Sequence, residues 1–256
     1  MKEIELLQNI AQQGFRIFTT KDLQEIGQLI GLNPSSLKGL THKMVRQGLL
    51  KKLFQGTFAL DNTLLAGSPL HDYEVIPFLA NPSAICCWNA MSYHGLTDQL
   101  PRCVWILSPS GQTSKKTSQY LYHVGATEYR VIRVQPHHYY GVEKYFINET
   151  PVWITDLERT LLDGLIRPQY SGGFFEVMTA FEWAQDRVNS EKLVDYALKY
   201  GILVSKRLGW VFETLGIFPK MVKVLKEIPC KAVYKLDVTR PNEGEILSGW
   251  NLRKNF

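Results

Sequence analysis

The sequence lacks an apolar run long enough to cross a membrane and lacks a leader-like N-terminus. A membrane helix needs about 18 or more apolar residues in succession, and no window of the 256-residue chain approaches that length. The first ten residues, MKEIELLQNI, carry Glu3 and Glu5 where a signal peptide would carry cations. We therefore expect a cytoplasmic protein, and a hydrophobic content of 45% can supply a packed core.

Cysteine is also scarce, and its spacing fits neither a disulfide framework nor a zinc site. No Cys-x-x-Cys pair occurs among the four cysteines, which are Cys86, Cys87, Cys103 and Cys230. Cys86 and Cys87 are adjacent within an apolar segment that has a helical pattern. Buried free thiols are therefore the favoured interpretation.

Acidic residues are missing between residues 33 and 60. This segment, NPSSLKGLTHKMVRQGLLKKLFQGTFAL, contains five cations and no Asp or Glu. Residues 1–60 hold eight Lys or Arg and four Asp or Glu, whereas the remainder holds 21 and 20. Most of the net charge of +5 therefore lies in the first quarter of the chain. Such a field favours a polyanionic partner, although a solvated basic surface also explains many such runs.

Periodicity and cap residues divide the first 60 residues into short elements. A helix is expected before the segment FRIFTT, which can form a short strand. Thr20 is expected to cap a second helix that ends at Gly31, and Asn33 and Pro34 are expected to begin a third. LLKKLF and TFAL then predict a hairpin that turns through a glycine. This order predicts a winged helix-turn-helix over residues 1–62.

The third helix has an apolar face and an opposed basic face. In a winged helix this helix enters the major groove, while cations on it and on the hairpin contact phosphates. Ser35, His42 and Arg46 are expected to contact base edges, and the lysines to contact phosphates. Docking of a protein by the same fold remains the alternative. The predicted DNA-binding residues are Ser35, Ser36, Lys38, Gly39, His42, Lys43, Arg46, Lys51, Lys52 and Gln55.

The remainder of the chain predicts a larger mixed domain over residues 69–240. Residues 61–70 lack periodicity and contain Gly67 and Pro69, so the linker is placed there. RCVWILSP, EYRVIRVQP, EKYFIN and TPVWIT are rich in β-branched and aromatic residues and predict strands of a mixed or antiparallel sheet.

Helices are predicted for the segments HDYEVIPFLA and SAICCWNAMSYHGL. Further helices are predicted to begin at about residue 155 and to span residues 174–185, 190–200 and 204–215. The predicted fold class is α+β: an N-terminal winged helix-turn-helix followed by a mixed domain with a helical C-terminal half. Residues 241–256 are expected to form a tail that is loosely held unless Trp250 docks.

The segment TDLERTLLD concentrates charge at the start of a predicted helix. Thr155 and Glu158 have the spacing of a capping box, and Asp156 favours the positive helix end. Arg159 and Asp163 are four residues apart and can pair on one face. This structural interpretation is favoured over an acidic metal or nuclease site.

Two further candidates have ordinary structural explanations. Lys206 and Arg207 can form a basic patch for nucleic acid, but a solvated helix face is preferred. His137 and His138 can ligate a metal, but no second cluster completes a coordination shell, so a surface loop is preferred. No catalytic residue, metal or cofactor is predicted.

Three segments resemble the C-terminal domain of the AbiEi antitoxins of abortive-infection and type IV toxin-antitoxin systems. They are SAICCWNAMSYHGL, VWITDLERTLLDGLIRPQYSGGFFEV and LVDYALKYGILVSKRLGWVFETLG, and with the winged helix the likeness covers residues 1 to about 220. The resemblance implies a transcriptional repressor that binds inverted repeats of double-stranded promoter DNA at its own operon. It also implies that the protein counters a nucleotidyltransferase toxin without forming a stable complex with it.

One position departs from that family. Gln55 and Gly56 stand where the wing of relatives often has an Arg-Gly tip. This weakens the case for wing insertion into a minor groove, but not for phosphate contacts by Lys51 and Lys52.

Two functions are therefore weighed. The first is a DNA-binding antitoxin and autorepressor, and because one winged helix makes few contacts, two copies on a repeat are expected. The second is a nuclease or nucleotidyl transferase that the winged helix delivers to nucleic acid, with Asp156, Glu158 and Asp163 as its best residues. The first is preferred.

Overall fold

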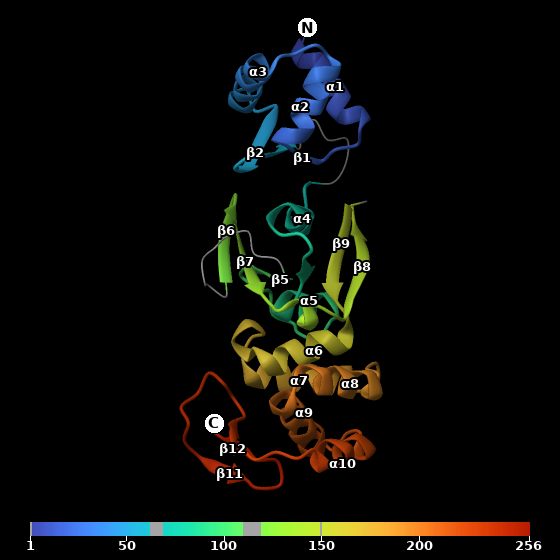
Figure 1. Ribbon diagram of the computed structural model, residues 1–256, viewed down its shortest axis with the longest axis vertical. Helices are drawn as coiled ribbons and strands as arrows, with labels where there is room; N and C mark the ends of the chain where they lie inside the picture. Colours follow the sequence, from blue (N-terminus) through green and yellow to red (C-terminus); the bar gives the residue numbers. More distant parts are fainter. Residues whose placement is uncertain (1, 62–68, 110–118, 149) are drawn as a thin grey trace.

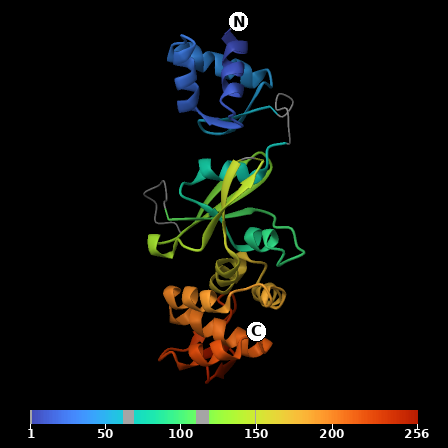
Figure 2. The same ribbon diagram turned by 90° about the vertical axis from the view of Figure 1, so that its right-hand side faces the viewer.

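The computed structural model describes residues 2–61, 69–109, 119–148 and 150–256. Three parts follow one another along the long axis of the molecule (Figure 1): a head formed by residues 2–61, a central sheet, and a helical part with the C-terminus. The same succession is visible from the side (Figure 2). The fold is α+β, as predicted. Most of the linker predicted at residues 61–70 lies outside the described residues.

The head is a winged helix-turn-helix. Its elements are α1 (Lys2–Gln12), β1 (Ile17–Thr19), α2 (Thr20–Leu29), α3 (Pro34–Arg46), β2 (Leu50–Phe54) and β3 (Thr57–Leu60). The strands form an antiparallel sheet of order β1-β3-β2, which we call the wing sheet. The N-cap predicted for α3 is confirmed, because Asn33 Oδ1 accepts a hydrogen bond from the Ser36 amide at 2.8 Å. The cap of α2 is Thr19, in a capping box with Asp22, so the prediction of Thr20 was wrong by one residue.

The central sheet has six strands in the order β6-β7-β5-β4-β9-β8. It is mixed, because β5 pairs in parallel with β7 and β4 with β9, while the other pairs are antiparallel. The four predicted strands are present, whereas β6 was not predicted and β4 lies in a segment predicted to be helical. The bounds are β4 (Ala84–Ile85), β5 (Val104–Ser108), β6 (Gln119–Val124), β7 (Thr127–Arg133), β8 (Val142–Ile147) and β9 (Thr150–Thr155).

Two short helices pack against this sheet. The segment HDYEVIPFLA forms a 3-10 turn, η1 (Asp72–Val75), and α4 (Ile76–Leu79), which lies between the β6–β7 and β8–β9 pairs (Figure 1). α5 (Cys87–Tyr93) follows β4 and packs against β5 and α6. Cys86 and Cys87 are buried free thiols, as interpreted from the sequence. Two further 3-10 turns are η2 (Pro136–His138) and η3 (Pro168–Tyr170).

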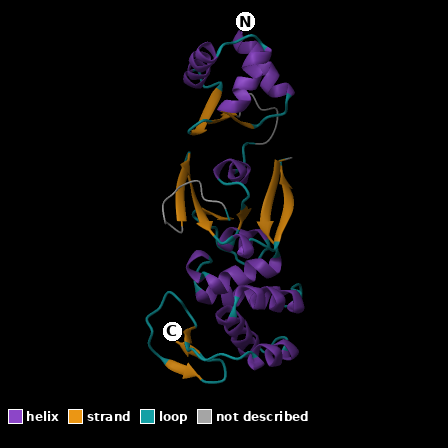
Figure 3. Cartoon of the chain, in the orientation of Figure 1, coloured by secondary structure: helices purple, strands orange, loops and turns teal. Residues whose placement is uncertain are grey.

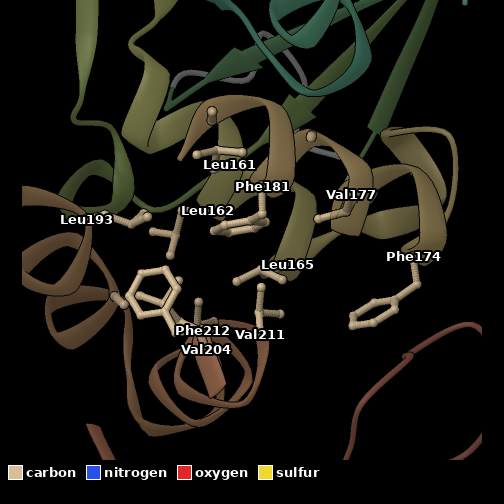
Figure 4. Close-up of a cluster of buried hydrophobic side chains, with 14 of the residues drawn as sticks. Leu161, Leu162, Leu165, Phe174, Val177, Phe181, Leu193, Val204, Val211 and Phe212 are labelled. Carbon is tan, nitrogen blue, oxygen red and sulfur yellow. The ribbon is translucent and has the colours of Figure 1, made fainter. Parts of the chain in front are cut away.

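Helices dominate the part of the chain after the central sheet (Figure 3). Leu161, Leu162 and Leu165 of one helix point toward Phe181 and Phe212 of two others and form a common core (Figure 4). Three helices match the prediction within two residues, and α10 was not predicted. The bounds are α6 (Leu157–Ile166), α7 (Phe174–Ala184), α8 (Ser190–Tyr200), α9 (Ile202–Leu215) and α10 (Pro219–Glu227).

The C-terminal segment is packed against this helical part. β10 (Tyr234–Lys235), β11 (Glu245–Leu247) and β12 (Leu252–Lys254) form a small sheet in which β12 is central. Trp250 is buried against Gly209 of α9, where any larger side chain would clash with its ring. Residues 241–256, expected to form a tail, are therefore integrated into the fold through Trp250 and β12.

One face of the wing sheet packs in the core of the head, and the other face packs against the central part. Leu50 and Phe58 lie in the core of the head with α1, α2 and α3. Ile17, Leu53 and Ala59 instead join an apolar cluster with residues of η1, α4 and the central sheet. The wing sheet is therefore shared between the core of the head and the core of the central part.

A buried carboxylate also lies at the contact between the head and the central part. Glu74 of η1 is fully buried, and Arg16 of the head donates to its two oxygens at 2.7 and 3.2 Å. Thr150 donates at 2.8 Å, the His71 amide at 2.8 Å and the Asn148 amide group at 3.2 Å. Burial alone would raise the pKa of Glu74, but these hydrogen bonds together lower it. Glu74 thus ties the head to two separate segments of the central part.

Candidate nucleic-acid interface

The third helix of the head presents its predicted basic face to solvent. Leu37, Thr41 and Met44 are buried, which fixes the rotation of α3 about its axis. The predicted DNA-binding residues are all exposed: Ser35, Ser36, Lys38, Gly39, His42, Lys43, Arg46, Lys51, Lys52 and Gln55. The central part therefore does not cover this face of the head.

A groove of about 860 Å³ runs between α3, the start of α2 and the wing sheet. Lys38, His42 and Arg46 line it from α3, and Lys52 lines it from β2. None of its lining residues is acidic. The structure thus brings together four of the predicted residues around one hollow of positive charge, which suits a phosphate backbone.

Sequence reasoning missed several residues that line this groove. Thr20 and Gln24 contribute from α2, and Thr41 and Val45 form part of its apolar floor. Thr41 is buried and Val45 is half-buried, so both lie at the edge of the apolar side of α3, where the helical wheel places them. The contribution of α2 depends on tertiary packing and has no local signal.

Lys51 and Lys52 lie on opposite faces of β2. In antiparallel pairing, directly opposite residues share a face, and Lys52 pairs with Phe58 while Lys51 pairs with Ala59. Phe58 belongs to the core of the head and lines the groove, whereas Ala59 belongs to the cluster at the central sheet. Lys52 therefore borders the groove, and Lys51 extends from the face of the wing sheet that packs on the central part.

The remaining predicted residues of α3 lie around the groove without lining it. Lys43 forms an ion pair with Glu3 of α1 at 2.6 Å, so part of its charge is neutralised. Ser35, Ser36 and Gly39 lie on the exposed surface beside the groove. A Cβ atom on Gly39 would meet no atom within 4 Å, so the surface there is open.

The hairpin tip is held back against α2. The Thr20 amide and hydroxyl donate to the Gly56 carbonyl oxygen at 2.8 and 3.2 Å, and Gly56 has φ +72°, which favours glycine. Gln55 is exposed at this tip. The wing is therefore short and tethered, which agrees with its lack of an Arg-Gly tip.

The charged segment at the start of α6 has a different cap from the one predicted. Asp156 is the N-cap, and its Oδ1 accepts from the Arg159 amide at 2.7 Å. Thr155 is buried at the end of β9, where its hydroxyl contacts that of Thr160 at 2.8 Å. The predicted capping box of Thr155 and Glu158 was therefore wrong, although Asp156 lies at the positive helix end as predicted.

Glu158 and Asp156 are used to hold α8. Glu158 accepts from the Asn189 amide at 2.8 Å and pairs with Lys192 at 2.9 Å. Asp156 pairs with the same lysine at 3.2 Å. Burial would lower the pKa of Lys192, but the two carboxylates raise it above its ordinary value. Both acids therefore have structural partners.

The predicted pair of Arg159 and Asp163 is present and completely buried. Arg159 Nε lies 3.0 Å from Asp163 Oδ1, and Arg159 Nη1 donates to the His138 carbonyl oxygen at 2.8 Å. His138 stacks on Tyr200 with ring centroids 4.4 Å apart, and η2 is a surface turn as predicted. In the part of the chain that the structure describes, no three metal-ligating side chains gather in position to hold an ion.

Lys206 and Arg207 are neither a basic patch nor a solvated face, because both are buried. Lys206 Nζ donates to the carbonyl oxygens of Leu225 and Lys226 at the end of α10, at 3.1 and 3.0 Å. Arg207 donates to the carbonyl oxygens of Lys235 and Leu165 at 2.7 to 3.1 Å. Burial lowers the pKa of Lys206 and lowers that of Arg207 to about 10. The basic patch and the solvated helix face were therefore both wrong, whereas a structural role for these two residues agrees with their burial.

Comparisons with known proteins identify a shared fold. No family model and no curated protein matches the sequence. The crystal structure of the RV2827C protein from Mycobacterium tuberculosis is similar over 97% of this chain and 89% of that chain, with a TM-score of 0.68 and 14% sequence identity. No helix in the described residues has the length and apolar character needed to span a membrane.

Proposed function

We propose that the protein is a sequence-specific DNA-binding transcriptional repressor that acts in the cytoplasm. The observation that carries this proposal is the acid-free groove between α3 and the wing sheet, lined by Lys38, His42, Arg46 and Lys52. An exposed α3 fits the width of the major groove, and the groove beside it can receive the phosphate backbone of one strand.

The contacts divide by position. His42 and Arg46, with Ser35 beside them, lie on the side of α3 that faces away from its buried residues, so they are placed to reach base edges. Lys38 and Lys52 lie on the two walls of the groove and are placed for phosphates. Because the wing tip is tethered to Thr20, base reading is assigned to α3 alone.

We further propose that this repressor is the antitoxin of a type IV toxin-antitoxin or abortive-infection operon, opposing a nucleotidyltransferase toxin without a stable complex. This part rests on the sequence resemblance of the three segments to AbiEi antitoxins. Its targets are inverted repeats in the operon's promoter, which two copies of the chain would occupy.

The enzymatic alternative has no observation in its favour. Asp156 caps α6, Glu158 holds α8, and Asp163 is buried against Arg159. A metal-dependent activity would need these carboxylates at an open site, so we do not propose one.

Promoter binding provides the test of DNA recognition. The full-length protein is expected to bind a duplex from its own promoter more tightly than a scrambled duplex, measured by fluorescence anisotropy at low and moderate salt. Arg46→Ala is expected to reduce this preference by about 1–3 kcal/mol, because it removes a base contact. Lys144→Ala, on the outer strand β8, is the matched control. Equal affinity of the wild type for both duplexes would contradict the proposal.

Toxin neutralisation is tested separately. The nucleotidyltransferase-like product of a neighbouring gene is expected to arrest growth when it is expressed alone. Co-expression of this protein is expected to restore that growth. Growth arrest that persists with full expression of the protein would refute the antitoxin role and leave DNA recognition intact.

A further inference from the structure

The end of the molecule opposite the head carries a second basic segment. Between residues 214 and 236 the sequence has five lysines and a single acid, Glu227. Residues 214–256 hold eight Lys or Arg and four Asp or Glu, whereas residues 61–213 hold 13 and 16. The chain therefore has two positive ends separated by a slightly negative middle.

Helix α10 displays most of these lysines on its surface. Leu225 is buried and Met221 and Val222 are half-buried, so these residues fix α10 against the helical core. Lys220 and Lys223 are exposed. Figure 1 places α10 at the far end of the long axis from α3.

Few carboxylates neutralise this surface. Lys226 pairs with Glu213 at 2.7 Å, and both side chains are 45% exposed. For Lys220, Lys223 and Lys231, the described residues supply no ion-pair partner. Glu227, exposed at the end of α10, is the one carboxylate of this helix against three lysines, so α10 keeps a net positive charge.

The position of Lys220 is unfavourable for the helix itself. It is the second residue of α10, where the helix dipole favours anions, and the N-cap Phe218 provides no side-chain hydrogen bond. The neighbouring helices α6, α7 and α8 each carry a glutamate in their first turn. A cation that opposes local stability at an exposed position is a candidate for a contact with an external anion.

We propose that the exposed face of α10, with Lys220 and Lys223, binds the phosphate backbone of a nucleic acid. The ammonium groups of these lysines are point charges, and contacts to phosphate carry no sequence information, so this binding is independent of base sequence. The site is separate from the groove of the head and does not depend on the function proposed for it.

A head-deficient background isolates this site. Lys38→Ala with Arg46→Ala and Lys52→Ala in the full-length protein, which removes the lysines and the arginine of the head groove, is expected to retain weak binding to a labelled duplex of random sequence at low salt. Adding Lys220→Ala and Lys223→Ala is expected to abolish that residual binding. Adding Lys144→Ala and Lys199→Ala instead removes the same amount of charge from β8 and α8. This control is expected to retain the residual binding.

The salt dependence measures the number of phosphate contacts. In the otherwise unchanged protein, Lys220→Ala with Lys223→Ala is expected to reduce the slope of log affinity against log salt by about 2 for duplex DNA and about 1.4 for single-stranded RNA. Comparing these two probes shows which nucleic acid supplies the phosphates. Unchanged far-ultraviolet circular dichroism and thermal unfolding establish that the variant is folded.

Three results would overturn this proposal. One is an equal effect of the control lysines, because net charge alone would then explain binding. Another is full retention of residual binding without Lys220 and Lys223. The third is lysine-dependent binding of phosphatidylserine vesicles without any effect on DNA or RNA. Loss of promoter preference in Arg46→Ala would be unaffected by each of them, so the two proposals fail independently.

Discussion

Two adjacent pairs of basic residues, Lys51-Lys52 in the head and Lys206-Arg207 in α9, have opposite surroundings. The first pair is exposed, and Lys52 borders an acid-free groove. The second pair is buried and donates its hydrogen bonds to backbone carbonyl oxygens. Lys206 and Arg207 thus stabilise the fold because the chain supplies hydrogen-bond acceptors for them. Lys52 has no such acceptor in the described part of the chain and remains available to a binding partner.

The same contrast separates the head from the rest of the molecule. Among the described residues, the basic face of α3 forms one ion pair, between Lys43 and Glu3. In the helical part, Arg159 and Asp163 form a buried pair within α6, and Glu158 and Lys192 form a half-buried pair that joins α6 to α8. Removing charged side chains from the helical part should therefore reduce stability, whereas removing them from the head should reduce binding.

The largest effect on stability is expected for Asp163→Asn. It leaves the fully buried Arg159 without its carboxylate, which should cost about 3–5 kcal/mol of the free energy of unfolding. Urea denaturation measures this loss. Replacing both residues, as Arg159→Met with Asp163→Leu, should be less damaging because the fully buried Arg159 charge is removed, and only the partly exposed Arg167, 3.6 Å from Asp163, loses a carboxylate. A single substitution that cost no more than the double one would refute the pairing.

The next effect compares the two basic pairs directly. Arg207→Met removes the donor for the Lys235 and Leu165 carbonyl oxygens and should cost about 2–4 kcal/mol. Lys52→Met removes an exposed side chain and should change stability by no more than about 0.5 kcal/mol. Thermal and urea unfolding of the two variants provide the comparison. A similar loss of stability in both variants would contradict the contrast between a buried structural pair and an exposed pair.

The seam between the head and the central part should show a pH dependence. Hydrogen bonds lower the folded-state pKa of Glu74, so its stabilisation is complete above the ordinary value of 4.5 and is lost as the pH falls through the lowered value. Glu74→Gln keeps the shape but removes the charge opposite Arg16, and should cost about 2 kcal/mol at neutral pH.

Unfolding at several pH values tests this expectation. The difference in stability between wild type and Glu74→Gln should shrink on acidification below the ordinary pKa. Thr150→Val, which removes one hydrogen bond but leaves the Glu74 charge, is the control. A difference that stays constant on acidification would contradict the role assigned to Glu74.

Local patterns predicted much of this fold. The periodicity of residues 190–200 gave the bounds of α8, and Asn33 with Pro34 gave the start of α3. β4 was missed because its two residues pair with β5 and β9, which are distant in sequence. The docking of residues 241–256 depends on Trp250 meeting Gly209, and no local pattern carries that contact.

The candidate interface was partly predictable for the same reason. The exposed side of α3 follows from its apolar stripe, and the opposite orientations of Lys51 and Lys52 follow from strand alternation. The burial of Lys206 and Arg207 was not predictable, because their acceptors are backbone carbonyl oxygens that only the tertiary fold brings near.

The most direct test of the central claim compares Lys52→Ala with Lys51→Ala in binding to promoter duplex over a range of salt concentrations. If phosphates lie in the groove, Lys52→Ala should weaken binding to promoter and scrambled duplexes alike and reduce the salt slope by about 1. Lys51→Ala, on the opposite face of β2, should have a clearly smaller effect. Equal effects of the two substitutions, or no effect of Lys52→Ala, would contradict the assignment of DNA to this groove.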